Sequence, residues 1–399
     1  MDVIFKSLLP FLGIIITLIV IHELGHFVTA KMAGVKVLEF GLGYPPRIWG
    51  VKRGETEYTI NAVPLGGFVR MVGEEDPTDP RSLAVKPRWV RLVVLSAGAF
   101  MNIVLAIFLF SLALAIPRTV DISQSRIVEV VPGSPAEEAG LETGDVIFAV
   151  NGKDVQNIGE LGYRIRLGLG DTLDLGIRRG DGELLEIPVY ARWTAPSWID
   201  EDGEVRPQGP TGITISSAYG SDRPLTPEEQ EEIASQLPPG EPVPTTRYVP
   251  ATETQSLAPW NALREGAPRA PESLILFVKD IISRVKGGVG ESQGVQVTGP
   301  VGIAQLTGEV VDEAGWKSLI DLAAMISMSL GVLNILPLPM LDGGRVVFVL
   351  LEYARRGKRV APEKEAMVHF VGLVAMLLFA VVITYFDIIR IFSGEGIIR

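Results

Sequence analysis

The chain has 399 residues, of which 47% are hydrophobic, and a formal net charge of −11. This length allows two or three structural units, and the acidic balance argues against nucleic acid as a partner. The absence of cysteine excludes a disulfide scaffold and a thiolate metal site, and three histidines limit any metal site to three imidazole ligands.

The first predicted membrane span runs from about Leu8 to Ala30 and carries the run His22-Glu23-Leu24-Gly25-His26 near its end. Two histidines four residues apart lie on one helix face and can share one Zn²⁺. The glutamate between them is the usual general base of a zinc hydrolase. Ionisable groups are costly at membrane depth, so they indicate function. A secretory signal is the alternative for this apolar run, but no small-residue cleavage site follows it.

Residues 35–73 carry strand signals between the first two spans. Residues 40–46 form a turn-rich apolar segment, and 56–63 and 65–72 are predicted to be two paired strands with glycines near their turn. An exposed sheet edge there could hold an extended peptide by strand addition. The alternative is a cytoplasmic hairpin that only packs on the helices.

The second predicted span, from Leu92 to Ile116, contains Gly98 and Asn102 four residues apart. Small residues and amides commonly join membrane helices, so a structural role is one interpretation of this pair. Together with the first span, this segment defines a predicted unit over residues 1–117.

A different pattern begins after the second span. Alternating β-branched residues surround a short predicted helix at Pro135–Ala139, and Asn151-Gly152 is a strong hairpin signal. The run from Ser134 to Gly152 is similar to a PDZ domain in the circularly permuted form of bacterial proteases. The resemblance implies one such domain over residues 118–195. Its other predicted elements are a helix at 158–167 and strands at 172–178 and 184–190.

Residues 196–271 are rich in proline, glycine and acidic side chains, which predicts a linker with a short acidic helix over Leu225–Leu237. Residues 272–290 are predicted to form an amphipathic helix on the membrane surface, with a buried helix of the PDZ region as the alternative.

The last predicted unit, 291–399, holds a third span from Leu319 to Leu336 and a fourth from about Ala366 to Phe386. Catalytic zinc normally takes three protein ligands and one water. The third span ends in a break with two prolines, and non-helical backbone at this depth is tolerated only against protein or water. Asp342 follows the break and is the predicted third ligand. A kink whose aspartate only caps the next helix is the alternative.

Loop charges predict the orientation of the spans. The connection 31–91 holds ten Lys/Arg against seven Asp/Glu, whereas 118–313 holds 16 basic and 31 acidic residues. Basic loops stay in the cytoplasm, so the acidic region and both termini are predicted to be extracytoplasmic. Asp342 then lies at the depth of the histidines. Asp321 and Asp387 fall at the opposite end, and His369 remains a rival third ligand.

His22-Glu23-Leu24-Gly25-His26 together with the segment from Asn334 to Gly344 resembles the site-2 protease family of intramembrane zinc proteases, closest to the bacterial regulator-of-sigma-E protease branch. The resemblance implies that His22, His26 and Asp342 bind Zn²⁺ and that Glu23 activates water. It also implies a substrate cleft lined by a set of four residues: Asn102, Asn334, Pro337 and Pro339. It further implies that the strands after the first span form a membrane-re-entrant β element.

The predicted fold is therefore a polytopic α-helical membrane protein with four transmembrane helices, a membrane-re-entrant β element and an inserted extracytoplasmic PDZ domain. The predicted function is zinc-dependent cleavage, in a bacterial inner membrane, of single-pass membrane proteins such as anti-sigma factors or remnant signal peptides. Membrane lipid and extracytoplasmic peptide tails at the PDZ domain are the other predicted partners. A catalytically silent PDZ-bearing scaffold is the alternative, and a metal transporter is a further rival.

Overall fold

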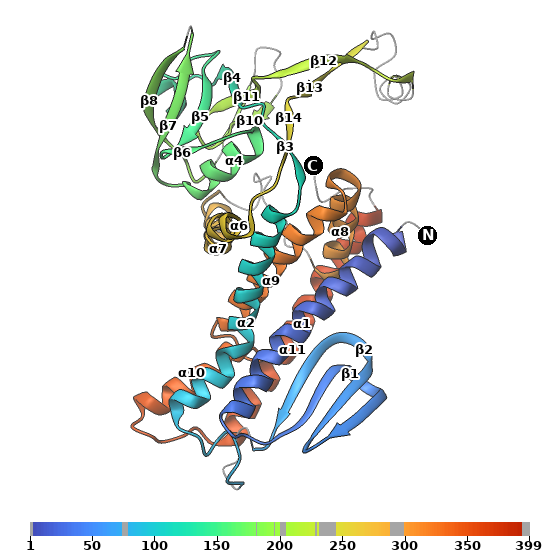
Figure 1. The fold of residues 1–399 in the computed structure, drawn as a ribbon. Helices are drawn as coiled ribbons and strands as arrows, with labels where there is room; N and C mark the ends of the chain where they lie inside the picture. The colour runs from blue at the N-terminus through green and yellow to red at the C-terminus, as the bar shows by residue number, and fades with distance from the viewer. Residues whose placement is uncertain are drawn as a thin grey trace. The chain divides into compact units, whose positions relative to one another are not determined.

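The computed structural model describes residues 3–73, 79–180, 182–194, 196–199, 205–227, 230, 245–287 and 299–392. The chain divides into two compact units, which we call the helical unit and the β unit. The helical unit contains Met1–Ile116, Leu257–Leu274 and Gln296–Arg399, and the β unit contains Pro117–Ser256 and Ile275–Val295. Figure 1 shows the elements of both units.

The helical unit is built from long apolar helices that pass beside one another. Among the described residues, four helical segments are long and apolar enough to cross a membrane, which confirms the four predicted spans: Phe5–Met32, Arg88–Ala115, Trp316–Ile335 and Pro362–Ile389. The helices of this unit are η1 (Val3–Leu8), α1 (Leu9–Met32), α2 (Arg88–Ala115), α6 (Pro259–Gly266), α8 (Pro300–Ala314), η2 (Trp316–Ser318), α9 (Leu319–Ile335), α10 (Asp342–Ala354) and α11 (Pro362–Phe392).

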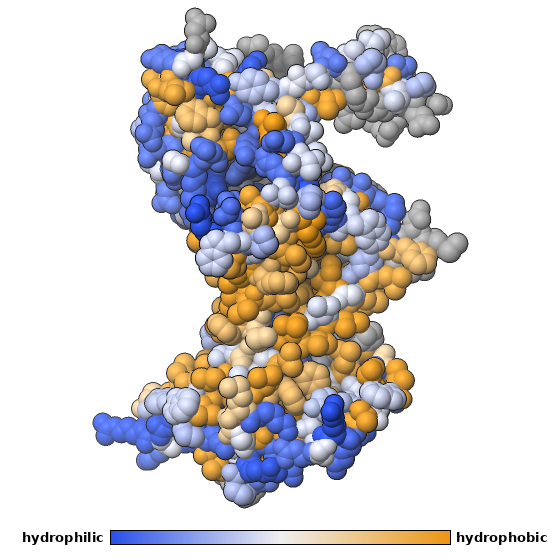
Figure 2. Space-filling view, in the orientation of Figure 1, coloured by the Kyte–Doolittle hydropathy of each residue, from blue (hydrophilic) through white to orange (hydrophobic). Residues whose placement is uncertain are grey.

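Apolar side chains cover the outside of these helices, which is the reverse of a water-soluble bundle. On α11, Leu378 and Phe379 are 63% and 62% exposed, and Figure 2 shows apolar side chains gathered over the helices of this unit. A helix that is apolar all round is favoured only in a buried or lipid environment. The helical unit is therefore the membrane-embedded part of the protein.

Close packing between α1, α2 and α9 depends on glycines. A Cβ on Gly25 of α1 would lie 2.5 Å from the Ala97 carbonyl oxygen of α2, and a Cβ on Gly331 of α9 would lie 3.0 Å from the Ala99 carbonyl oxygen. Apolar side chains gain little from leaving lipid, so membrane helices associate through small residues that let backbones meet. This contact holds α2 directly against the end of α1 that carries the histidines.

Strands β1 (Val37–Arg53) and β2 (Thr56–Met71) follow α1 and form an antiparallel sheet with irregular register. Glu39 lies opposite both Arg70 and Glu57, and Leu42 lies opposite both Gly67 and Ile60. The first part of β1 therefore lies between the two halves of β2. This corrects two sequence predictions, because residues 40–46 belong to a strand, and 56–63 and 65–72 form one strand that pairs with β1. Figure 1 shows this sheet in blue beside α1.

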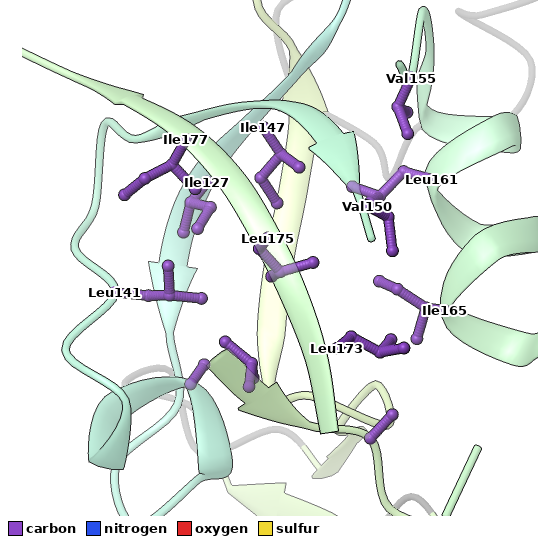
Figure 3. Close-up of a cluster of buried hydrophobic side chains, with 13 residues drawn as sticks. Ile127, Leu141, Ile147, Val150, Val155, Leu161, Ile165, Leu173, Leu175 and Ile177 are labelled. Atoms are coloured by element: carbon purple, nitrogen blue, oxygen red, sulfur yellow. The ribbon is translucent and has the colours of Figure 1, made fainter. Parts of the chain in front are cut away.

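The β unit is organised around one sheet with the strand order β11-β4-β5-β7-β8, in which β6 also pairs with β5. Its strands are β4 (Ser125–Val130), β5 (Val146–Val150), β6 (Lys153–Asp154), β7 (Thr172–Arg179), β8 (Glu183–Tyr190) and β11 (Ile213–Ser217). Ile127, Ile147, Leu175 and Ile177 of these strands are fully buried, and Figure 3 shows their side chains meeting in one core with Leu161.

Two short helices flank this sheet, and each begins at a polar cap. The Ser134 side chain accepts a hydrogen bond from the Glu137 N–H at the start of α3 (Pro135–Glu138), and Asn157 accepts one from the Glu160 N–H at the start of α4 (Ile158–Leu167). Such caps satisfy backbone donors that lack a partner inside the helix. The predicted helix at 158–167 matches α4, and the strands predicted at 172–178 and 184–190 match β7 and β8 within one residue.

In the described part of the predicted linker, 196–271, the chain instead forms short strands and a helix. Strand β11 from this region joins the core sheet by pairing with β4, Ile213 opposite Val130. The other elements are β9 (Ser197–Ile199), β10 (Val205–Pro207), β12 (Gly220–Pro224), β13 (Thr246–Pro250), β14 (Thr252–Gln255) and helix α6. The helix predicted over Leu225–Leu237 lies mostly outside the described residues.

The two ends of the segment Pro117–Ser256 lie close together in space. Strand β3 (Arg118–Asp121) pairs antiparallel with β14, so Arg118 lies opposite Gln255. In the helical unit, the Leu257 N–H donates to the Leu114 carbonyl oxygen at 3.0 Å. This segment is therefore an insertion whose two ends are adjacent. Helix α7 (Arg269–Gly287) covers most of the predicted interfacial helix 272–290, and its Ala270 is buried with Phe110 of α2.

Candidate metal centre

Three side chains from two helices converge inside the helical unit. His22 and His26 project from α1, and Asp342 is the first residue of α10. Asp342 Oδ2 lies 3.0 Å from His22 Nε2 and 3.1 Å from His26 Nε2, and the two imidazole nitrogens lie 3.2 Å apart. The three side chains are between 8% and 20% exposed. The structure thus brings together the three predicted ligands, of which His26 and Asp342 are 316 residues apart in sequence.

This arrangement fits a zinc ion. With zinc–ligand bonds of about 2.0–2.1 Å, the ligand atoms of a tetrahedral site lie roughly 3.3 Å apart, close to the three separations here. Two imidazoles and one carboxylate are also a usual ligand set of hydrolytic zinc, which keeps its fourth position for water. The geometry and the donor chemistry therefore agree.

A backbone carbonyl fixes the tautomer of His26. Its Nδ1 lies 2.8 Å from the carbonyl oxygen of Val94 on α2. A carbonyl oxygen only accepts hydrogen bonds, so Nδ1 carries the proton and Nε2 presents its lone pair to the centre. Such outer contacts orient metal-binding histidines. Sequence analysis missed Val94, because a backbone contact leaves no side-chain signature.

Asn102 stands behind His22 in the same way. Asn102 is only 1% exposed, and its side-chain Nδ2 lies 3.4 Å from His22 Nδ1. Asn102 Oδ1 is buried without a hydrogen-bond partner. This position suits a role in orienting His22, which differs from the substrate contact predicted from sequence.

Gly98 of α2 lies directly against the two histidines. A Cβ on Gly98 would lie 2.6 Å from His22 Nε2 and still closer to His26 Nε2, the two atoms that face Asp342. No side chain fits between the α2 backbone and these nitrogens. Gly98 therefore lies against the imidazoles of both histidines, and Asn102 lies against that of His22.

Glu23 lies beside the three converging side chains. His22, His26, Asp342 and Arg345 are all near enough for their charges to act on its carboxyl group. Strand β2 passes the same place, because a Cβ on Gly67 would lie 2.9 Å from Glu23 Cγ and 2.8 Å from Ile19 Cγ2. Arg345 carries no motif signal and was missed by sequence analysis.

The loop between α9 and α10 delivers Asp342. Helix α9 ends at Ile335, and Pro337 and Pro339 prevent its continuation. The chain then folds back so tightly that a Cβ on Gly343 or Gly344 would collide with the carbonyl oxygens of Leu336 or Leu338. Asn334 and Pro339 are half-buried and Pro337 is exposed. Their predicted contact with substrate stays a prediction.

The rival acidic and imidazole ligands lie elsewhere. His369 of α11 accepts a hydrogen bond from the Met340 N–H through Nδ1 at 2.9 Å. Asp387 accepts hydrogen bonds from the Gly299 and Gly302 N–H groups, both at 3.0 Å, and so caps α8. Asp321 is in the first turn of α9. The structure places Asp342, and not these three, beside both histidines.

A membrane-embedded helical unit that presents two histidines, a glutamate and an aspartate in this way defines a zinc metalloendopeptidase of the membrane. The profile described as peptidase family M50 matches residues 10–379. The chain belongs to this family, the site-2 protease family, and uses Zn²⁺.

Similar proteins carry matching descriptions. The chain is 32% identical over 374 residues to a putative zinc metalloprotease of Clostridium perfringens, covering 93% of this chain and 95% of that protein. It is 28% identical to the zinc metalloprotease RasP of Oceanobacillus iheyensis, covering 94% and 97%. It is 27% identical to a putative zinc metalloprotease of Thermotoga maritima, covering 95% and 98%. These similarities favour an enzyme over the silent scaffold considered from sequence.

Proposed function

We propose that this protein hydrolyses peptide bonds within or beside the transmembrane segments of single-pass membrane proteins. The observation that carries the proposal is the convergence of His22, His26 and Asp342 within 3.2 Å of one another on helices of the membrane-embedded unit. A hydrolytic centre on such helices suits a substrate that itself has a transmembrane segment.

His22 Nε2, His26 Nε2 and one Asp342 oxygen would hold the zinc ion. When bound there, zinc supplies polarisation of the scissile carbonyl and activation of water. Glu23 then takes the proton of the attacking water and passes it to the leaving amine. The Val94 carbonyl oxygen, 2.8 Å from His26 Nδ1, keeps the opposite ring nitrogen available for the metal.

The β1–β2 sheet would present the substrate to this centre as a membrane-re-entrant element. A peptide bond inside a helix is hydrogen-bonded and sterically hidden, so a transmembrane substrate has to unwind before water can attack. Gly67 of β2 packs on Glu23, and an extended peptide can add to a strand at such a point through backbone hydrogen bonds. Exposed apolar side chains on β1, among them Ile48 at 70% and Trp49 at 54%, support contact with membrane lipid.

The β unit would act as an extracytoplasmic PDZ domain that binds peptide tails. Strand β11 forms one edge of its sheet, and β11 lies next to α4 as well as β4. Such an edge can bind an extended tail by strand addition. Only trimmed membrane proteins would then reach the centre. Anti-sigma factors shortened by a first protease and remnant signal peptides in a bacterial inner membrane belong to this substrate class.

A cleavage assay with a purified single-pass substrate tests the proposal. Glu23→Gln removes the base but keeps all three ligands, so we expect cleavage to fall at least about 10²-fold while zinc stays bound. Asp342→Ala removes a ligand, so we expect loss of both zinc and cleavage. Glu313→Gln, a change at an exposed residue of α8, is the control and should behave as wild type. Wild-type turnover by the Glu23 variant would falsify the hydrolytic mechanism.

A further inference from the structure

The loop that places Asp342 has one backbone donor that only another helix satisfies. Within residues 336–341, all described, the Leu336, Leu338 and Leu341 N–H groups donate to carbonyl oxygens of α9 or of the loop itself. Pro337 and Pro339 have no N–H. The Met340 N–H remains, and it donates to Nδ1 of His369 on α11 at 2.9 Å. An unpaired backbone group at membrane depth is costly, so this contact fixes the loop to α11.

The backbone of Met340 is also strained. Its φ is +82°, a conformation that side chains other than glycine rarely adopt. Such a conformation persists only where surrounding contacts hold it. Met340 stands two residues before Asp342, so any relaxation of its backbone is passed directly to the carboxylate.

One turn after His369, α11 makes a second contact with the same loop. A Cβ on Gly372 would collide with Pro339 Cβ and would lie 3.0 Å from the Pro339 carbonyl oxygen. Residues three apart share a helix face, so Gly372 and His369 point the same side of α11 at consecutive loop residues. Glycine at 372 lets the helix backbone approach closely enough for the His369 contact.

The imidazole of His369 is poorly explained by packing alone. Because Nδ1 accepts from Met340, the neutral ring carries its proton on Nε2, and Nε2 is buried without a partner. Leaving a buried donor unpaired is unfavourable, and an apolar side chain would avoid that cost beside the Phe348 ring, 5.5 Å away. The useful property of His369 at this position is its acceptor nitrogen.

We propose that His369 is a positioning residue that holds the Pro339–Met340 backbone and thereby sets the position of the Asp342 carboxylate in the metal centre. The inference rests on the proposed role of Asp342 as a zinc ligand. His369 is not one of the three converging side chains; it acts through the loop, and α11 thus supports the metal centre although it supplies no ligand.

The decisive experiment compares two His369 variants in the full-length protein. His369→Leu keeps the apolar volume but removes the acceptor, whereas His369→Asn places a carbonyl oxygen where Nδ1 stood. Zinc affinity is measured by competition with a chelator, and the absorption spectrum of the Co²⁺-substituted protein reports the ligand geometry. Loss of a group that orients a ligand typically weakens metal binding by about 10- to 100-fold.

We expect that weakening, with an altered Co²⁺ spectrum, in His369→Leu, and values near wild type in His369→Asn. Gly372→Ala should resemble His369→Leu, because its methyl group would displace Pro339. Two controls match these changes. Met367→Leu alters a side chain of α11 that is 65% exposed, and Gly13→Ala adds a methyl group to a membrane helix where nothing lies within 4 Å.

Asp342→Ala separates this inference from the proposed function. If Asp342→Ala keeps wild-type zinc affinity, the ligand assignment itself is wrong. If Asp342→Ala loses zinc while His369→Leu keeps wild-type affinity and spectrum, the ligand stands and the positioning role is overturned. Equal losses in His369→Leu and His369→Asn, with unchanged thermal unfolding, would likewise overturn it, because the acceptor atom would then be irrelevant.

Discussion

Gly98 of α2 lies against His22 of α1 so closely that a Cβ on Gly98 would be 2.6 Å from His22 Nε2. The atom concerned is the one that faces Asp342, 3.0 Å away. The α2 backbone therefore forms one wall of the metal centre. The contact of Gly98 with His22 thus packs α2 against α1 and also limits where the imidazoles can lie.

Replacing Gly98 by alanine should therefore remove zinc without removing a ligand. The added methyl group has no space beside the two imidazoles, and α2 is held by its own contact with Gly25, so the imidazoles have to move. We expect Gly98→Ala to lose bound zinc and cleavage together, measured as metal content and turnover of the purified protein. Gly13→Ala is the matched control, and normal zinc content in Gly98→Ala would contradict the contact.

The amide of Asn102 provides a second test of the histidine environment. When a metal occupies His22 Nε2, Nδ1 carries a proton and requires an acceptor. Asn102 Oδ1, now unpaired, satisfies it if the amide turns by 180°. We expect Asn102→Leu to weaken zinc binding by about 10- to 100-fold and Asn102→Asp to retain it, because a carboxylate supplies the same acceptor. A zinc titration of both variants decides this, and equal losses in the two would exclude the orienting role.

The spans and the converging ligands follow from the sequence because each has a local signal. A long apolar run predicts a membrane helix by length alone, and His22 and His26 share a helix face by spacing alone. Asp342 required the proline break as a marker of irregular backbone within an apolar segment. The close contacts of Gly98 and the Val94 carbonyl oxygen depend on how α2 lies against α1, and no local pattern encodes that distance.

The errors in the β regions have a related cause. Strand β11 reads as linker because it is short and lies among prolines and glycines, yet pairing with β4 makes it part of the core sheet. The two parts of β2 are adjacent in sequence and were predicted to pair with each other. Both instead pair with β1, where Glu39 lies opposite both Glu57 and Arg70. Strand pairing over such separations is not encoded in local propensity.

Glu352, at the other end of α10 from Asp342, should make stability depend on acid pH. Its side chain is 6% exposed and forms ion pairs with Arg91 at 2.5 Å, Arg88 at 3.1 Å and Arg359 at 3.3 Å. Burial alone would raise the pKa of Glu352, but hydrogen bonds from Arg91 and Arg88 and the charges of Arg91 and Arg359 hold that pKa below its usual value.

A lowered pKa in the folded state means that the carboxylate contributes stability above about pH 4.5, the usual glutamate value, and that this is lost as pH falls through the lower folded pKa. Glu352→Gln should remove the contribution at neutral pH. Because Arg88 and Arg359 are 34% and 38% exposed, we expect the lower value for hydrogen bonds to a charged group, about 1.5 kcal/mol. Thermal unfolding in detergent between pH 3 and 7 measures both effects, with exposed Glu363→Gln as control. A parallel pH dependence in wild type and Glu352→Gln would contradict this role.

Removal of the inserted segment should change substrate choice and leave the chemistry intact. Leu114 and Leu257 are joined by a backbone hydrogen bond of 3.0 Å, so a short glycine-serine linker from Ile116 to Leu257 can replace Pro117–Ser256. Deletion of 126–190 alone is the poorer design, because it would remove β4 and leave β11 without its pairing partner.

No histidine lies in Pro117–Ser256, and the ligand-bearing helices belong to the helical unit. We therefore expect the shortened protein to bind zinc and to cleave a trimmed substrate at a rate close to that of the full chain.

A substrate that keeps its extracytoplasmic domain should be cut poorly by the full chain and more readily by the shortened protein. The measurement is the ratio of the two cleavage rates for each enzyme, after metal content has confirmed an intact centre. If the ratio is the same with and without the segment, it does not control access, and binding of a separate partner becomes the better account of the β unit.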